Sequence, residues 1–162
     1  MMISETMAKR LNLQVNNEFF AFWTYQAMAY CFEDMGYKGF AGWFYAQARE
    51  EMGHAMKIAK YMTEQGATVQ LSTLAQPKHD YKTVEEIVNG ALEHELKVTR
   101  DINEIADLAY KENDHATRQF NDWFVKEQVE EVSTVTDLLD LVRKAQTPGQ
   151  LLMIERGLTR ES

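Results

Sequence analysis

The chain has 162 residues, of which 45% are hydrophobic and 26% charged, and this composition fits one soluble domain with a substantial core. Its net charge of −8 argues against a nucleic-acid partner, and its single cysteine, Cys31, excludes an internal disulfide and a four-cysteine metal site. No apolar run reaches the roughly 18 residues that a membrane helix needs, and the polar N-terminus has no signal core, so we expect a cytoplasmic protein without a membrane segment.

The first half of the chain predicts two long helices joined by a tight turn. Apolar residues recur with the period of an α-helix over residues 4–34 and again over 39–65. Ser4 has the side chain of an N-cap, and the two glycines of the segment GYKG break the pattern between the helices. Gly66 follows the second helix at the position where a left-handed residue often ends one.

A stretch without helical period separates these two helices from the next pair. Residues 67–82 contain Pro77 and are unusually numerous for a connection between helices, which fits a crossover along the length of a bundle. Thr83 and Glu86 then have the spacing of a capping box at the start of a third helix that reaches about Lys111.

The last third of the chain predicts one more long helix and a short one. Asn113 or Asp114 serves as the N-cap of a fourth helix that runs to about Lys144. Thr147 is the expected N-cap of a fifth helix over 148–158, with proline as its first residue. We therefore predict an all-α fold: an antiparallel four-helix bundle with one long crossover between helices two and three, in a single domain over 1–162.

Each long helix carries one glutamate near the middle of its apolar, core-facing stripe, traced by alternating steps of four and three residues. In the first helix this stripe includes Phe22. The four acids are Glu18, Glu51, Glu95 and Glu131. Four carboxylates in an apolar core repel one another and are poorly solvated, and no lysine or arginine lies in any stripe to neutralise them. Bound cations relieve this cost, so the pattern predicts a buried metal site.

A histidine and two other polar residues lie on the same stripes. His54 is one turn from Glu51, so the pair is expected to ligate one metal ion, with Glu51 able to bridge to a second. Imidazole combined with carboxylates favours redox-active iron. Gln128 either coordinates a metal or fixes the register of its helix, and Tyr25 either fills the core or has a hydrogen-bonding or redox role.

Three more glutamates flank the predicted site on the neighbouring positions Glu50, Glu127 and Glu130. Such acids usually form a solvated helix face, but together they are also suited to a third, more exposed cation position. Lys57 is expected to be an ordinary charge on an exposed face.

These residues, in this order and spacing, resemble the bacterial non-haem ferritins. The segments EEMGH and EQVEE, together with the glutamates of helices one and three, carry the resemblance, which extends over the whole chain including the crossover and the fifth helix. It implies an iron-storage protein with ferroxidase activity, which oxidises Fe(II) with O₂ or peroxide at a di-iron centre inside each subunit. It also implies a homo-oligomeric cage of 24 subunits, about 450 kDa, that stores ferric mineral.

The resemblance also implies roles for individual residues. The first iron would be held by Glu18, Glu51 and His54. The second would be held by Glu51, Glu95 and Glu131. Gln128 and Tyr25 match residues beside the centre, and Glu131 with Glu50, Glu127 and Glu130 matches the third iron site of bacterial members.

Two related classes fit less well. The fourth helix lacks the second Glu-x-x-His of bacterioferritins, and although Met52 matches their haem-ligating position, haem is not expected. A carboxylate-bridged di-metal enzyme acting on an organic or peroxide substrate would use the same bundle without a cage. A metal-free helical bundle is a further alternative. Sedimentation separates the ferritin cage from this bundle and from the di-metal enzyme, because only the cage predicts a particle of about 450 kDa.

Overall fold

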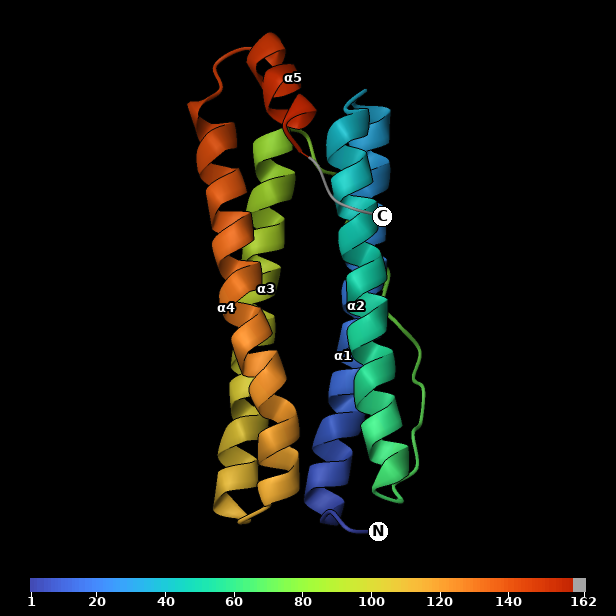
Figure 1. Cartoon of the computed structure of the whole chain (residues 1–162). Helices are drawn as coiled ribbons and strands as arrows, with labels where there is room; N and C mark the ends of the chain where they lie inside the picture. Colours follow the sequence, from blue (N-terminus) through green and yellow to red (C-terminus); the bar gives the residue numbers. More distant parts are fainter. Residues whose placement is uncertain (159–162) are drawn as a thin grey trace.

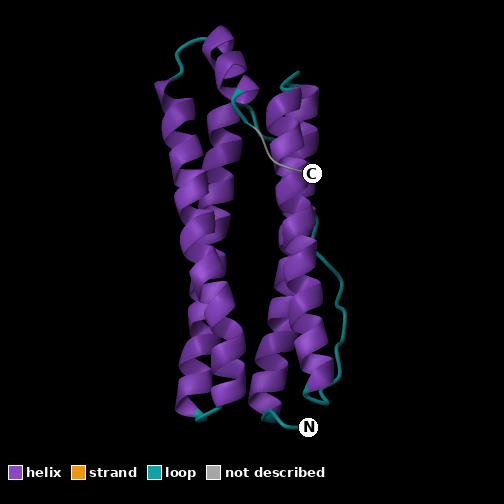
Figure 2. Ribbon diagram, viewed as in Figure 1, coloured by secondary structure: helices purple, strands orange, loops and turns teal. Residues whose placement is uncertain are grey.

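Four long helices run side by side along the whole molecule, the first and fourth in one direction and the second and third in the other (Figure 1). The structure, a computed structural model, describes residues 1–158. The helices are α1 (Glu5–Asp34), α2 (Lys38–Glu64), α3 (Val84–Lys111), α4 (His115–Lys144) and the short α5 (Pro148–Arg156). The described chain contains no strand (Figure 2), which confirms the all-α prediction. Residues 159–162 of the predicted single domain lie outside the described part.

The helix ends follow the local signals in the sequence. The Ser4 side chain accepts a hydrogen bond from the backbone of Met7 at 2.9 Å, as predicted for the N-cap of α1. Asp114, and not Asn113, caps α4, because Asn113 has the positive φ of 55° that lets the chain turn after α3. Gly66 likewise has a φ of 77° just after α2.

Three of the other predicted ends differ slightly from the structure. Helix α2 begins and ends one residue earlier than expected, and α5 ends at Arg156 and not near residue 158. The Thr83 hydroxyl accepts a hydrogen bond from the Glu86 backbone as expected. The Glu86 carboxylate, however, accepts one from the backbone of Lys82, one residue before the cap. The reciprocal capping box forms instead at α5, between Thr147 and Gln150.

The crossover over residues 67–82 is held against α1 by two asparagine side chains. The amide nitrogens of Asn12 and Asn16 both donate to the carbonyl oxygen of Gln70, at 3.1 and 2.9 Å. Their amide oxygens accept from the backbone of Gln70 and Ser72, at 2.7 and 2.8 Å. These side chains therefore satisfy backbone groups of an extended segment that has no secondary structure of its own. Figure 1 shows this segment running along the outside of the α1–α2 pair.

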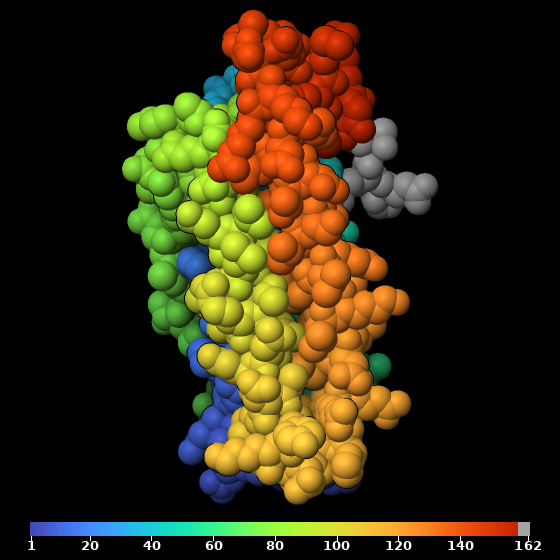
Figure 3. Space-filling view, turned by 90° about the vertical axis from the view of Figure 1, so that its left-hand side faces the viewer, coloured from blue at the N-terminus to red at the C-terminus, as the bar shows by residue number. Residues whose placement is uncertain are grey.

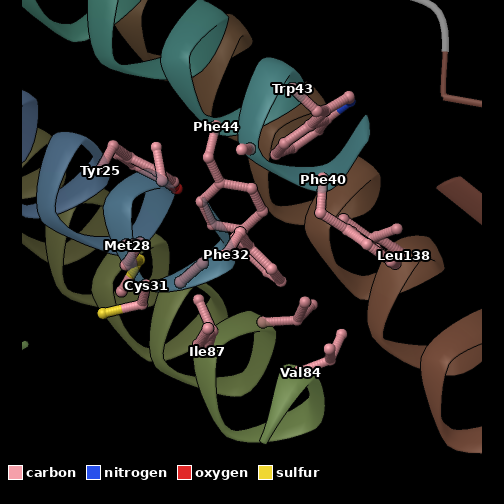
Figure 4. Packing of buried hydrophobic residues seen from close by; sticks show 14 of the residues in the cluster. Tyr25, Met28, Cys31, Phe32, Phe40, Trp43, Phe44, Val84, Ile87 and Leu138 are labelled. Atoms are coloured by element: carbon pink, nitrogen blue, oxygen red, sulfur yellow. The ribbon is translucent and has the colours of Figure 1, made fainter. Parts of the chain in front are cut away.

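The apolar core is divided into two clusters, one toward each end of the bundle. One cluster centres on the rings of Phe32, Phe40 and Phe44, with Phe32 and Phe40 stacked at 5.1 Å (Figure 4). The other contains Leu11 and Ile58. The four stripe glutamates lie between the two clusters, so the fold buries them at mid-height.

Helix α5 covers the end of the bundle, above the long helices (Figure 3). The Glu155 carboxylate accepts hydrogen bonds from the backbone of Gly39 and Phe40, at 2.9 and 3.2 Å. Tyr37, the N-cap of α2, makes no side-chain capping bond, so Glu155 supplies it from another helix. A side chain at Gly39 would lie 2.9 Å from Glu155, which explains the need for glycine there.

The two helical hairpins approach each other less closely than the helices within each hairpin. Helix α1 packs mainly on α2, and α3 on α4. Within residues 1–158, no Cα atom of α2 lies within 8 Å of a Cα atom of α4, so long side chains bridge that gap. In the same described part, no helix has the length and apolarity that crossing a membrane requires.

Candidate metal centre

The four stripe glutamates meet in one buried layer at mid-height. Their side chains come from four different helices, and none is more than 6% exposed. The oxygens of Glu51, Glu95 and Glu131 lie within 4.8 Å of one another, and so do the ligand atoms of Glu18, Glu51 and His54. Glu51 belongs to both triads, so the geometry provides two adjacent positions with a shared carboxylate.

The first triad contains an unsatisfied oxygen. The Nδ1 atom of His54 is 3.1 Å from Glu51 Oε2 and 4.0 Å from Glu18 Oε2. The other oxygen of Glu18 accepts from the Gln14 amide at 2.8 Å, but Glu18 Oε2 is buried without a hydrogen-bond partner. A buried carboxylate oxygen without a partner is costly, and a cation placed among these three side chains would satisfy it.

Amide and hydroxyl donors orient the remaining carboxylates. The Gln47 amide donates to both Glu51 Oε1 and Glu131 Oε2, each at 2.8 Å, and so joins α2 to α4. Tyr25 donates its hydroxyl to Glu95 Oε1 at 2.6 Å. Each of these bonds fixes a carboxylate from outside the centre, as second-sphere hydrogen bonds do around metal ligands.

The Gln128 side chain also supports a carboxylate in this structure. Its amide nitrogen donates to Glu95 Oε2 at 3.1 Å and to the Glu95 carbonyl at 3.2 Å. This contact favours the positioning role for Gln128 over direct coordination, which would use its amide oxygen.

Burial raises the proton affinity of the carboxylates. It raises the pKa of Glu18 well above the usual value, and repulsion from Glu51 adds to this effect. Burial, followed by repulsion from Glu95 and Glu131, does the same to the pKa of Glu51. Burial and then the charges of Glu95 and Glu50 raise the pKa of Glu131 to about 8. At neutral pH the metal-free centre therefore keeps a proton on Glu131, and a cation that binds there must displace it.

The flanking acids are brought together only in part. Glu127 is half-buried, and its carboxylate lies with His54 and Glu131 in a third triad of atoms within 4.8 Å of one another. Glu50 is exposed, but its charge acts on Glu131. Glu130 is exposed, and nothing in the described structure places it in a triad. Its role stays a prediction.

Three features of the site differ from the sequence expectations. Ala21 is fully buried where the predicted stripe of the first helix used Phe22, which is only partly buried. Gln14 and Gln47 support carboxylates in a way that the sequence analysis does not predict, although each lies four residues before the glutamate it contacts, a spacing that brings helical side chains together.

The expectation that Lys57 lies on an exposed face is wrong. It is half-buried, and its ammonium lies 3.2 Å from the centre of the Trp123 ring. Trp123 comes from α4, so the sequence of α2 alone contains no signal for this contact.

Comparisons with known proteins agree with this geometry. The family model described as a ferritin-like domain matches residues 8–145. The chain is 36% identical to the bacterial non-heme ferritin of Staphylococcus haemolyticus, over 99% of this chain and 98% of that protein. It is 35% identical to the bacterial non-heme ferritin of Staphylococcus aureus, over 97% and 95%. A crystal structure of an open pore ferritin from the hyperthermophilic archaeon Archaeoglobus fulgidus superimposes with a TM-score of 0.96, at 34% identity and 99% coverage of both chains.

Proposed function

This chain belongs to the ferritin family, and from that premise we propose that its buried layer is a ferroxidase centre that takes two Fe(II) ions as substrate. The protein thus stores iron, and the centre supplies the ferric product. The observation that carries the proposal is the pair of buried triads that share Glu51. Glu18, Glu51 and His54 would hold one ion, and Glu51, Glu95 and Glu131 the other.

The charges of the layer match two divalent ions. Once their protons are displaced, the four carboxylates carry four negative charges, which equal the four positive charges of two Fe(II) ions, so the loaded centre is neutral. Placing Glu51 between the ions also screens their mutual repulsion. Oxidation adds two positive charges that the layer does not balance, and this imbalance favours departure of the ferric product toward a mineral store.

The electrons and protons of the reaction balance in a simple way. Each Fe(II) gives one electron, and the two electrons with two protons convert O₂ to hydrogen peroxide, or hydrogen peroxide to two water molecules. The chain's own part is to hold the ions side by side on rigid helices and to keep the carboxylates oriented. Gln47 and Tyr25 perform the second task through the hydrogen bonds that they donate.

A third cation position is part of the proposal. Glu127 with His54 and Glu131 supports it, and Glu50 acts on the same carboxylate of Glu131. Glu130 would complete this more exposed position. Its ion would lie between the buried pair and the outside of the subunit, so we expect weaker binding there.

We further propose that the whole chain forms one ferritin-like domain, and that 24 copies form a cytoplasmic cage of about 450 kDa without haem at Met52. The likeness to ferritins of known structure supports an assembly of identical chains. Sedimentation of the purified protein tests the size of the particle.

Anaerobic titration of the metal-free protein with Fe(II), followed by stopped-flow absorbance after adding air, tests the centre. We expect two tightly bound ions per chain and rapid oxidation. Glu18→Ala should lower the oxidation rate by more than about tenfold, because it removes a ligand of the first ion. Glu93→Ala, an exposed glutamate on α3, is the matched control and should oxidise iron at the native rate. No stoichiometric binding in the wild type would contradict the proposed function.

A further inference from the structure

The Lys57 ammonium contacts the same two aromatic rings as His54, a proposed iron ligand. Its Nζ atom lies 3.2 Å from the ring centre of Trp123 and 5.7 Å from that of Phe124. His54, one turn earlier on α2, meets the same two rings in edge-on contacts, at 5.5 and 5.8 Å between ring centres. Stacking on an indole face holds an otherwise flexible lysine in one place. A fixed positive charge is therefore present beside the centre.

Glu127 connects this charge to the third cation position. It follows Trp123 by four residues on α4, so the two side chains lie on one face. Burial lowers the pKa of Lys57, and the charge of Glu127 opposes this lowering. The same carboxylate joins His54 and Glu131 in the third triad. Glu127 thus interacts both with a resident ammonium and with any metal ion in that triad.

We propose that Lys57 is a built-in competing cation that weakens metal binding at His54, Glu127 and Glu131 and so directs Fe(II) to the two buried positions. This inference rests on the proposed function. The effect is greatest for the third ion, because Glu127 belongs to that triad and to neither buried one. The charges act across a half-buried region, where screening is weaker than in bulk water. Removing the ammonium should therefore tighten third-ion binding by roughly three- to tenfold.

Calorimetric titration of the metal-free assembled protein with Zn²⁺, which has no redox chemistry, measures each binding event. Lys57→Met keeps an unbranched apolar side chain on Trp123 and removes the charge. Lys57→Arg keeps both the charge and the stacking. We expect the third dissociation constant to fall roughly three- to tenfold in Lys57→Met and to stay at the native value in Lys57→Arg, with the two tighter events retained in both. Glu127→Gln should weaken the third event in every background.

The contrary results separate the possible failures. An unchanged third event in Lys57→Met would show that the ammonium does not compete with the ion, and equal shifts in Lys57→Met and Lys57→Arg would show that Lys57 acts through packing. Either result would overturn the inference. A third event that survives Glu127→Gln would place the ion elsewhere and overturn it as well. In both cases the two tight events remain, and the proposed function remains with them. Absence of those two events from the wild type would contradict the proposed function and this inference together.

Discussion

Replacing a proposed ligand, Glu131, by glutamine should make the metal-free protein more stable. The Glu131 carboxyl is 6% exposed, and its pKa is raised to about 8, chiefly by burial and then by the charges of Glu95 and Glu50. In the unfolded chain the same group has a pKa near 4.5. At pH 7 the carboxyl is ionised in the unfolded chain and must take up a proton on folding. The pH lies about 2.5 units above the unfolded-state pKa, so this protonation costs about 3 kcal/mol. Glutamine has nearly the same shape, needs no proton, and still presents an oxygen to the Gln47 amide.

The effect has a definite pH dependence. Below pH 4.5 the Glu131 carboxyl is protonated in both the folded and the unfolded chain, so it does not lower the free energy of unfolding. Because its folded-state pKa is raised, the wild-type protein loses stability as the pH rises from 4.5 to about 8. The advantage of Glu131→Gln should therefore be near zero at pH 4.5, grow to about 3 kcal/mol per chain at pH 7, and level off above pH 8. With metal bound the order should reverse, since the variant has lost a ligand.

Thermal unfolding of the metal-free protein at pH 5 and pH 7, with and without Zn²⁺, measures both effects. About 3 kcal/mol corresponds to a rise in Tm of about 6–12 °C for a chain of this size. Glu93→Gln, which changes an exposed carboxylate, serves as the control and should move Tm by less than about 2 °C. A Glu131→Gln variant that is less stable than the wild type at pH 7, or equally altered at both pH values, would refute the reasoning.

Three other predictions concern the crossover, the fifth helix and proton release. Asn16→Ala removes two hydrogen bonds to the crossover, so the free energy of unfolding should fall by about 1–3 kcal/mol and proteolysis within residues 67–82 should speed up; unchanged cleavage would contradict the clamp. Glu155→Ala should cost about 1–2 kcal/mol at the start of α2 and accelerate amide exchange at Gly39 by about tenfold or more, while exchange in the middle of α2 stays constant. Zn²⁺ binding at pH 7 should release protons from the buried carboxyls, seen as a binding heat that depends on the ionisation enthalpy of the buffer; buffer-independent heats would show that the carboxyls are already ionised.

The helices and the depth of the four glutamates could be predicted because both depend on local periodicity. A stripe of apolar residues every three or four positions must face the core, so an acid on that stripe is buried whatever its neighbours are. The failure at Phe22 shows the limit of this method. A step of four and a step of three are equally regular, and only packing against the other helices selects Ala21.

Contacts between distant segments could not be predicted in the same way. Gln47 contacts Glu131 across 84 residues of sequence, and its two acceptors lie on different helices. Lys57 reaches Trp123 because α2 and α4 have one particular rotation relative to each other. Neither periodicity nor composition determines that rotation. The partners of these polar side chains and the partial burial of Lys57 therefore needed the structure, whereas the burial of the four stripe glutamates did not.

The two proposed metal positions take their ligands from different parts of the chain. Glu18, Glu51 and His54 all belong to the α1–α2 hairpin, whereas the second triad also takes Glu95 from α3 and Glu131 from α4. The metal affinity of the first position thus depends only on the internal geometry of one hairpin. The metal affinity of the second position also depends on the spacing between the hairpins. A change that shifts one hairpin against the other therefore alters the affinity for the second ion and leaves that for the first unchanged. A shift between the hairpins should therefore change the ratio of the two metal affinities, even when its cause lies far from every ligand.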